Sequence, residues 1–582
     1  MRIRAALAAG GALALVVGLG ACSENTGQDD DVVDTDTART GAIATDPKDS
    51  LGPAPEVPGA TKGGTIYILR ESKISHLDPQ RTYSFAGLMG SQLFARTVTA
   101  FKDDGKGNVT LVGDLAETPG TNVNNDCKVW EFKIKDGVKF EDGTPITSAE
   151  IAYGIARSFD PDLTGGPTYV QEWLADTAQY DTKWDFKANK TSLPPGLTAP
   201  DPKTLRFEFA KPRCDLPFAL SLPASAPLPP AKDTGVNLDN LPFASGPYKI
   251  TKHTPGVEMI LERNEHWDPK TDPIRHQYPD RFVWSFGADN ATQTNRALAD
   301  NGNDAFAIGT GGIPSELVAR VANDAALKDR TVLAATPNAY RLSINTSRVT
   351  DLAVRQAINY AIDRESITKN LGGQYGAVPI TTLLPPTTIG FKKFDAYPAG
   401  ATGNPAKAKE VLAGKTPPPL VVGTSDDTPS QETATQVKNA LEKAGFTVTV
   451  KVIPEDSYLD EVKKKTNPWD LWVDSWAADW PSGASILPVL FDGRGIKAEG
   501  NSNTSQLNNE ALNAEFDRIL ALDPAEQGNE WGKLDERIMK ELAPAVPLYV
   551  EVVYVAHGSK VGGLFIGSIF GWSSFVNVYA KQ

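Results

Sequence analysis

The pattern of apolar residues changes along the chain near residue 346. Before this point, short runs of β-branched and aromatic residues are separated by turn signals such as Asp136-Gly137, which predicts strands. One helix should interrupt them, because Thr147 and Glu150 have the spacing of a capping box and apolar residues follow at helical intervals. We therefore expect a mixed α+β region. Its predicted strands are Thr65–Arg70, Val129–Ile134, Thr204–Phe209, Val257–Glu262 and Arg281–Phe286.

Residues 347–545 favour helices that alternate with strands. Apolar residues recur at i, i+3, i+4 and i+7 from Val354, which predicts a helix that Asp351 caps. Further elements follow in the order β-α-β-α-β, which is typical of an open α/β lobe. They are the strand-like Leu420–Gly423, the helical Ser430–Ala444, the alternating Phe446–Ile453, the helical Glu455–Lys465 and the strand-like Trp469–Ser475.

Strand character returns after Ala543, so the chain is expected to leave one lobe and later come back to it. We predict an α/β protein with two lobes, in which lobe I comprises residues 62–346 and 547–582 and lobe II comprises residues 347–546. Two strands would then cross between the lobes, an arrangement that permits hinge motion. A length of 582 residues with 40% apolar side chains is sufficient for several domains with buried cores.

The N-terminus has the features of an export signal. Arg2 and Arg4 precede an apolar stretch that is too short for a permanent membrane helix. Its end, Leu19-Gly20-Ala21-Cys22, resembles the bacterial lipoprotein signal, which implies cleavage after residue 21 and attachment of lipid to Cys22. Two or three acyl chains would hold the protein in the bilayer at the extracytoplasmic face of the cell membrane. The alternative is an ordinary signal peptide with a chance cysteine.

Residues 22–61 are acidic and contain few large apolar side chains, so we expect a disordered tether. No later apolar run is long enough to span a membrane, and the run 546–556 is interrupted by Glu551. The formal net charge is −14 and no basic block occurs, which argues against a nucleic-acid partner.

The chain has three cysteines and five histidines, which leaves little material for a metal site. Outside the cytoplasm, Cys127 and Cys214 would meet an oxidising environment, and we expect a disulfide between them. The alternatives are two buried thiols or a thiol nucleophile.

A set of short motifs follows one order along most of the chain after residue 62. They are Gly63–Thr65, Leu77–Pro79, Trp130–Thr147, Ser245–Tyr248, Arg263–Trp267, Asn345–Arg364 and Trp469–Asp479. Together they resemble the bacterial extracellular solute-binding proteins of family 5, the peptide receptors of ABC importers. The resemblance implies a two-lobed, periplasmic-binding-protein-like architecture with a hinge and an interlobe ligand cleft. It also implies a short peptide ligand, an ABC permease and ATPase complex as partner, a monomer, no cofactor and no enzymatic activity.

The same resemblance indicates ligand-binding residues. Asp479 would pair with the α-ammonium of the peptide, and its alternative role is that of a turn residue or helix cap before Pro481. Trp476 and Trp480 flank Asp479 and would line the pocket. The peptide main chain would lie along Ser475, Trp476 and Ala477 on one side and near Tyr83, Ser84 and Phe85 on the other. This sequence departs from the common pattern at Ser475, where a glycine is usual, and at Pro481-Ser482-Gly483, which lacks an acidic residue.

Other residues of these motifs are expected to be structural. Trp469 and Trp472 should be core residues, and Arg355 and Arg364 should belong to a salt-bridged helix face.

Three rival functions remain open from the sequence. An enzyme is disfavoured, because Gly-x-Ser-x-Gly and His-Glu-x-x-His are absent and Gly414-Lys415-Thr416 lacks the rest of a phosphate loop. A receptor of the same fold for an oligosaccharide or a nickel chelate is the second. A surface sensor or adhesin is the third.

Overall fold

The computed structural model describes residues 40–582. The predictions for the signal peptide, for the lipid-bearing Cys22 and for the tether up to residue 39 concern residues outside this range.

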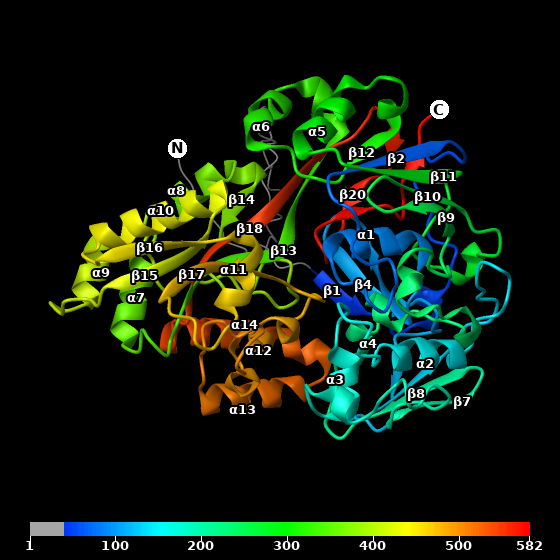
Figure 1. Ribbon diagram of the computed structural model, residues 1–582, viewed down its shortest axis with the longest axis horizontal. Coiled ribbons are helices and arrows are strands. Elements are labelled where there is room, and N and C mark those ends of the chain that lie inside the picture. The colour runs from blue at the N-terminus through cyan, green and yellow to red at the C-terminus, as the bar shows by residue number, and fades with distance from the viewer. Residues whose placement is uncertain (1–39) are drawn as a thin grey trace, which may run out of the picture. The chain divides into compact units, whose positions relative to one another are not determined.

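A six-stranded mixed sheet has the strand order β14-β18-β13-β17-β15-β16 (Figure 1). β13 is antiparallel to both β17 and β18, whereas β15 is parallel to both β16 and β17. We call the region built on this sheet lobe II and the region built on the remaining sheets lobe I. The strands are β13 (Thr331–Ile344), β14 (Ala377–Pro379), β15 (Leu420–Ser425), β16 (Val448–Ile453), β17 (Leu471–Ala477) and β18 (Ala545–Ala556).

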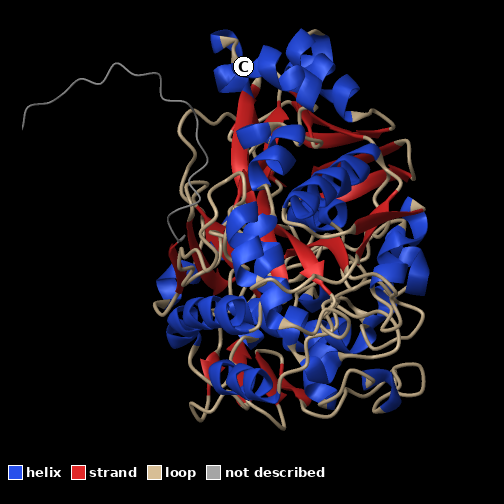
Figure 2. Ribbon diagram, turned by 90° about the vertical axis from the view of Figure 1, so that its left-hand side faces the viewer, coloured by secondary structure: helices blue, strands red, loops and turns tan. Residues whose placement is uncertain are grey.

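The helices of lobe II confirm the predicted alternation. Asp351 caps α7, and the order β15, α10, β16, α11, β17 is the predicted β-α-β-α-β succession. Figure 2 views this lobe and shows helices in front of the strands. The helices are α7 (Leu352–Ala361), α8 (Arg364–Asn370), α9 (Pro405–Val411), α10 (Thr428–Lys443), α11 (Glu455–Val462), α12 (Leu487–Phe491), α13 (Glu510–Leu520) and α14 (Pro524–Glu541).

The strands β13 and β18 connect the two lobes. The chain enters lobe II along β13 and leaves it along β18, and the two strands pair with each other over most of their length. One end of β18 packs through Val546 and Leu548 into the core of lobe II. The other end packs through Tyr554 and Ala556 against α5 (Asn290–Ala299) and α6 (Ser315–Ala322) of lobe I. The sheet therefore has the two crossing strands that the sequence predicts.

Lobe I contains a five-stranded sheet with the order β12-β2-β11-β10-β9. The helix α1 (Phe85–Phe94) packs on it, and Trp284 and Phe282 lie in the shared core. The strands are β2 (Thr65–Arg70), β9 (Tyr248–Thr254), β10 (Glu258–Arg263), β11 (Arg281–Phe286) and β12 (Ala307–Gly309).

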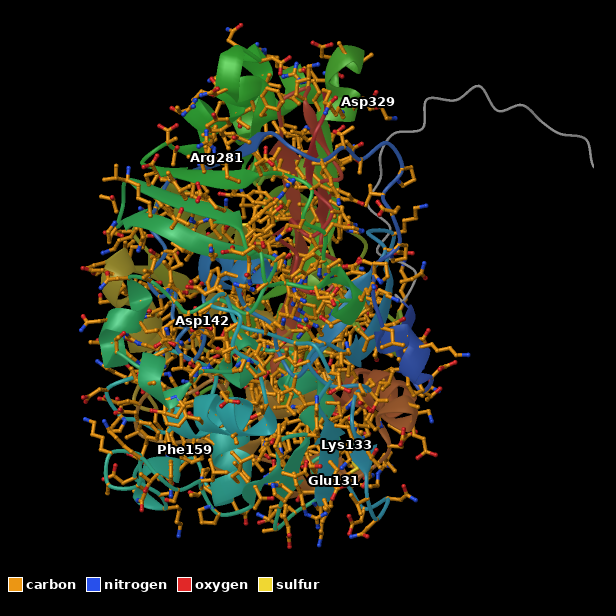
Figure 3. The ribbon with its side chains drawn as sticks, turned by 90° about the vertical axis from the view of Figure 1, so that its right-hand side faces the viewer. Glu131, Lys133, Asp142, Phe159, Arg281 and Asp329 are labelled. Atoms are coloured by element: carbon orange, nitrogen blue, oxygen red, sulfur yellow. A yellow bond between two sulfur atoms is a disulfide. The ribbon has the colours of Figure 1, made fainter. Side chains whose placement is uncertain are left out.

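A separate antiparallel sheet of lobe I has the order β5-β6-β8-β7. The helix α2 (Ser148–Arg157) packs on it and begins with the predicted capping box of Thr147 and Glu150. Figure 3 shows Arg281 of the five-stranded sheet and Glu131 of this sheet at opposite ends of lobe I. The remaining elements here are β5 (Thr121–Asn122), β6 (Val129–Lys133), β7 (Leu197–Asp201), β8 (Thr204–Glu208), α3 (Tyr169–Ala175) and α4 (Leu216–Ala219).

A disulfide joins Cys127 at the start of β6 to Cys214 before α4. The two residues are 87 positions apart, so the bond ties the four-stranded sheet to the segment that leads into Asp215.

The prediction of a disordered tether over residues 22–61 is wrong for residues 40–61. β1 (Thr40–Ile43) pairs in parallel with β4 (Asn108–Gly113), which also pairs with β3 (Thr99–Asp103). Ser50 is buried, and its hydroxyl accepts a hydrogen bond from the backbone N–H of Gly113 at 2.9 Å. Composition could not predict that residues 40–61 are structured. Backbone hydrogen bonds and small buried side chains hold this segment, rather than large apolar groups.

The predicted salt-bridged helix face of Arg355 and Arg364 is also wrong. Both arginines are buried and donate to backbone carbonyl oxygens instead. Arg355 reaches the carbonyl of Leu542, which ends α14, and Arg364 reaches the carbonyl of Pro547. The last turn of a helix leaves carbonyls without helical partners, and the β13–β18 ladder shifts register next to Pro547. The two guanidinium groups satisfy these carbonyls.

The prediction that Trp469 and Trp472 are core residues is confirmed, since both side chains are buried against Val462 and Ile453. Within residues 40–582, none of the helices has the length and apolar character needed to cross a membrane.

Candidate ligand-binding site

Asp479 lies two residues after the carboxyl end of β17, the region where open α/β sheets bind ligands. Two tyrosines of lobe I cover its carboxylate. The hydroxyl of Tyr83, just before α1, donates to Oδ1 at 2.6 Å, and the hydroxyl of Tyr169, at the start of α3, donates to Oδ2. Both hydrogen bonds therefore join lobe II to lobe I.

The electrostatics of Asp479 are unusual for a surface aspartate. Burial raises its pKa to about 6, although the two hydroxyl donors act in the opposite direction. Among residues 40–582, no cationic side chain acts on this pKa. A carboxylate with only neutral partners favours an incoming cation, because the positive charge offsets the cost of removing the anion from water.

Ser475, Trp476 and Ala477 form the end of β17. On one side this strand pairs with β13, where Tyr340 lies opposite Ser475 and Asn338 lies opposite Ala477. On the other side β15 pairs only with Leu471 and Trp472, so no described strand pairs with Ser475–Ala477 there. An extended peptide could add to this free edge through main-chain hydrogen bonds.

The two flanking tryptophans use their indole N–H groups within the protein. The Nε1 of Trp476 donates to the carbonyl of Ser485 at 2.8 Å. Trp480 is 1% exposed, and its Nε1 donates to Oδ2 of Asp215 at 3.0 Å. The predicted pocket-lining role does not match the position of Trp480, which lies in a buried contact between the lobes with the ring of Tyr169 4.7 Å away.

The three residues of the segment Tyr83-Ser84-Phe85 make different contacts. Tyr83 reaches Asp479, whereas Ser84 caps α1 by accepting a hydrogen bond from the N–H of Gly87 at 3.3 Å. Phe85 is 49% exposed, and its ring meets the ring of Trp572 edge-on at 5.8 Å. Tyr83 thus contacts the Asp479 carboxylate, Phe85 presents a half-exposed ring, and Ser84 is a structural cap.

Sequence reasoning did not find Tyr169 or Asp215. They lie 310 and 265 positions from their partners Asp479 and Trp480, and no periodicity or spacing indicates them. Burial raises the pKa of Asp215 to about 6, and the hydrogen bond from Trp480 opposes that shift.

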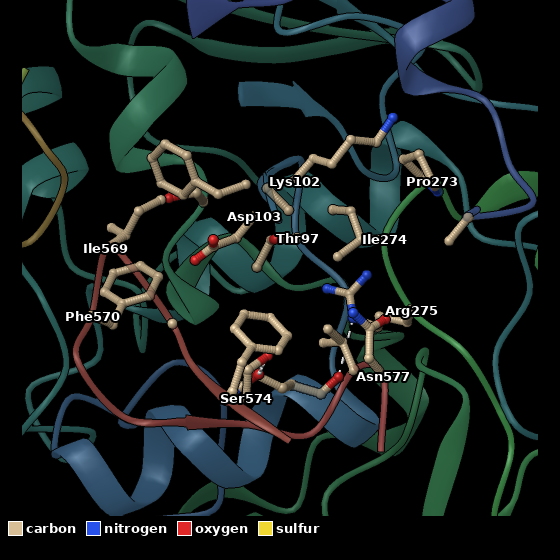
Figure 4. A pocket seen from close by; sticks show the side chains of 18 of the residues that line it. Thr97, Lys102, Asp103, Pro273, Ile274, Arg275, Ile569, Phe570, Ser574 and Asn577 are labelled. Carbon is tan, nitrogen blue, oxygen red and sulfur yellow. Dashed lines mark hydrogen bonds between the residues drawn. The ribbon is translucent and has the colours of Figure 1, made fainter. Parts of the chain in front are cut away.

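A cavity of about 450 Å³ lies in lobe I, and its lining does not include Asp479 (Figure 4). Ile569 and Phe570 line one side, and Arg275 lies opposite them. Elsewhere, no group of three or more His, Cys, Asp or Glu side chains within residues 40–582 is arranged to hold a metal ion.

Comparison with solved structures shows the same two-lobed fold. "Clavulanic acid biosynthesis oligopeptide binding protein 2" is 28% identical, with a TM-score of 0.83 over 94% of this chain and 99% of that chain. The protein DppA from Helicobacter pylori, in complex with the peptide STSA, is 21% identical, with a TM-score of 0.66 over 90% of this chain and 99% of that one.

Comparison with curated proteins gives similar coverage. The periplasmic murein peptide-binding protein MppA of Escherichia coli K12 is 25% identical over 536 residues, which is 86% of this chain and 90% of MppA. The glutathione-binding protein GsiB of Salmonella paratyphi A is 24% identical over 481 residues, which is 79% of this chain and 84% of GsiB. The family model for bacterial extracellular solute-binding proteins, family 5 Middle, matches residues 110–498. The chain therefore belongs to the bacterial extracellular solute-binding proteins of family 5.

Proposed function

We propose that this protein captures short peptides between its two lobes and delivers them to the permease and ATPase complex of an ABC importer. The observation that carries the proposal is the carboxylate of Asp479, which has only neutral partners and lies next to the free edge of Ser475–Ala477. MppA and GsiB are named for the peptides that they bind, which supports the same ligand class here.

In this proposal Asp479 binds the α-ammonium of the peptide. The ammonium has three donors, so it can bind the carboxylate while the hydroxyls of Tyr83 and Tyr169 keep their contacts. The electrostatic attraction strengthens as water leaves the closing cleft. Main-chain hydrogen bonds to Ser475–Ala477 would read peptide length and direction rather than side chains.

Closure would follow from contacts that the ligand makes to both lobes. We propose residues 62–346 with 547–582 and residues 347–546 as the two moving bodies. The hinge would be in β13 and β18, the strands of the six-stranded sheet that continue from lobe II into lobe I. A ligand that touches Asp479 of one body and Tyr83 or Phe85 of the other favours the closed state by its difference in affinity for the two states.

We also propose that a lipid on Cys22 anchors the protein to the extracytoplasmic face of the membrane as a monomer. The resemblance of residues 19–22 to a lipoprotein signal supports it. Incorporation of labelled fatty acid that is lost in Cys22→Ser tests the anchor, and unchanged labelling in that variant would contradict it.

Calorimetric titration with a pool of di- to hexapeptides tests the peptide proposal. N-acetylation of the peptides and Asp479→Asn should each weaken binding by about 10²–10⁴-fold, because each removes one partner of a buried charge pair. Asp136→Asn, at a side chain that is 95% exposed, is the matched control and should bind as the wild type does. No binding of any peptide, with heat released by an oligosaccharide or a nickel chelate, would overturn the proposal.

A further inference from the structure

Glu551 on β18, like Asp479 and Asp215, is a carboxylate without a cationic partner. Its Oε2 accepts hydrogen bonds from the hydroxyl of Thr336 at 3.3 Å and from Nδ2 of Asn338 at 3.4 Å, and both distances are long. No cationic side chain of residues 40–582 acts on it, and burial raises its pKa. The fold alone does not explain a carboxylate in this position, since neutral side chains would suit the same neighbours better.

The carboxylate lies at an irregularity in the crossing strands. β13 pairs through Ala335 with Val552 and through Ala339 with Val550, so residues 336–338 bulge opposite Glu551. Bulges redirect side chains and are frequent next to functional sites. Thr336 and Asn338 are themselves buried and turn their polar atoms toward Glu551.

On one side, the bulge adjoins the residues proposed to bind the peptide main chain. Tyr340 lies opposite Ser475 across the β13–β17 ladder and stacks on Tyr549 with 4.6 Å between ring centroids. Burial raises the pKa of Tyr340 to about 12, and the charge of Glu551 adds to this shift. Tyr549 and Glu551 are two residues apart on β18, so their side chains lie on the same face of the sheet as Tyr340.

On the other side, the bulge adjoins the lobe I wall of the candidate site. Gly571 lies so close to the bulge that a Cβ there would be 2.4 Å from Cβ of Thr336. The next residue, Trp572, contacts Phe85 through its ring. Glu551 is thus linked through Asn338 to the ladder that holds Ala477 and Ser475. It is linked through Thr336 and Gly571 to the segment that brings Trp572 against Phe85.

From this position we infer that Glu551, with Thr336 and Asn338, forms a second anionic subsite that takes a lysine or arginine side chain of the bound peptide. The inference rests on the proposed function and extends it to a class of peptide. Asp479 would hold the α-ammonium and Glu551 the side-chain cation, so the preferred ligands carry two positive charges.

The surroundings fit a long cationic side chain. A guanidinium or ammonium gives the carboxylate the charged donor that it lacks, and hydrogen bonds to a charged group are stronger than those from Thr336 and Asn338. The stacked rings of Tyr340 and Tyr549, on the same face of the two strands as the carboxylate, offer aromatic surface for the apolar stem and the cation.

The test is a calorimetric scan of tetra-alanine peptides with one arginine at each position in turn. Citrulline at the same position is the neutral isostere. Wild-type protein should bind the arginine peptide about 10- to 100-fold more tightly than its citrulline counterpart at one position. Glu551→Gln should reduce that ratio to about 2-fold or less while the affinity for tetra-alanine is retained.

Glu131→Gln on β6 is the matched control, because it removes a strand carboxylate at the far end of lobe I (Figure 3) and should keep the arginine preference. Glu551→Asp keeps the charge but shortens the side chain by one methylene, so its ratio of arginine to citrulline affinity should be intermediate. This variant replaces Glu551→Gln in the test if the glutamine variant does not fold. Equal affinity for arginine and citrulline at all four positions, or a preference that persists in Glu551→Gln, would overturn the inference. In either case binding of tetra-alanine would leave the proposed function intact, whereas failure of every peptide to bind would reject both.

Discussion

Two buried charged regions of the molecule differ in how their carboxylates are neutralised. In lobe I, Asp114 is fully buried and lies 2.7 Å from Nε of Arg96 and 3.0 Å from Nη2 of Arg275. Lys135 donates to its backbone carbonyl at 2.7 Å. Burial alone would raise the pKa of Asp114, but the charges of Arg275 and Arg96 hold it well below its usual range.

Asp479 and Glu551 show the opposite pattern, since hydroxyl and amide groups are their only side-chain partners and the pKa of each is raised. The difference separates two uses of buried charge. A network that contains its own counter-charges stabilises a fold, whereas a buried anion without one costs stability unless a cation or a proton neutralises it.

The largest expected effect comes from breaking the compensated network. Asp114→Asn leaves Arg96, Arg275 and Lys135 without their central anion, so the free energy of unfolding should fall by about 3–5 kcal/mol. Denaturant unfolding monitored by circular dichroism measures it. A loss well under 1 kcal/mol would show that these cations find other partners and that the network is not structural.

A smaller loss is expected at the aromatic contact between the lobes. Trp480→Phe removes the donor to the buried carboxylate of Asp215 and should cost about 1.5–3 kcal/mol, the range for a hydrogen bond to a charged group. The matched variant Trp476→Phe loses only a bond to a neutral carbonyl, so its cost in the same unfolding experiment should be about 0.5–1.5 kcal/mol. Equal losses would contradict the ionised state of Asp215.

The pH dependence of stability should identify the uncompensated carboxylate. Because the folded pKa of Asp479 is raised to about 6, its contribution to stability is present at low pH and is lost as the pH rises through about 6. Between pH 5 and pH 8 this amounts to about 1 kcal/mol, which Asp479→Asn should abolish. Unfolding midpoints at a series of pH values measure the effect, and parallel curves for both proteins would refute the assignment.

The smallest effect is expected at an exposed ion pair. Asp136 lies 2.6 Å from Lys203, yet its side chain is 95% exposed. Water and salt screen such pairs, so Asp136→Asn should leave the unfolding midpoint unchanged within error. A clear shift of the midpoint would contradict the expectation that exposed ion pairs contribute little to stability.

The sequence predicted lobe II better than the binding site, and the reason is locality. The helix α7 and its cap Asp351 follow from a periodic stripe of apolar residues within one short segment. The β-α-β-α-β order likewise follows from patterns that each lie within a single element. By contrast, Tyr169 lies 310 positions from Asp479, and only the folded chain brings their side chains together. Family resemblance indicated Asp479 and Tyr83 as candidate site residues, but neither resemblance nor pattern indicated Tyr169 on α3 or Tyr340 on β13.

Errors of the sequence-based predictions have a related cause. Arg355 and Arg364 lie on predicted helices, yet they donate to the backbone carbonyls of Leu542 and Pro547, which are 187 and 183 positions away. The strand β1 likewise depends on its pairing with β4, and the composition of residues 40–43 does not indicate that pairing.

The core of lobe I contains residues from two segments that are far apart in the sequence, and this affects the order of folding. Ile66 shares its core with Val578 and Ala580, and the hydroxyl of Thr61 donates to the carbonyl of Ala580, 519 positions away. During synthesis, every strand of lobe II is available before the last segment of lobe I appears. We expect lobe II to fold first and lobe I to stay incomplete until residues 557–582 are released. A chain stopped twenty residues early would thus hold a formed lobe II beside an open, aggregation-prone lobe I.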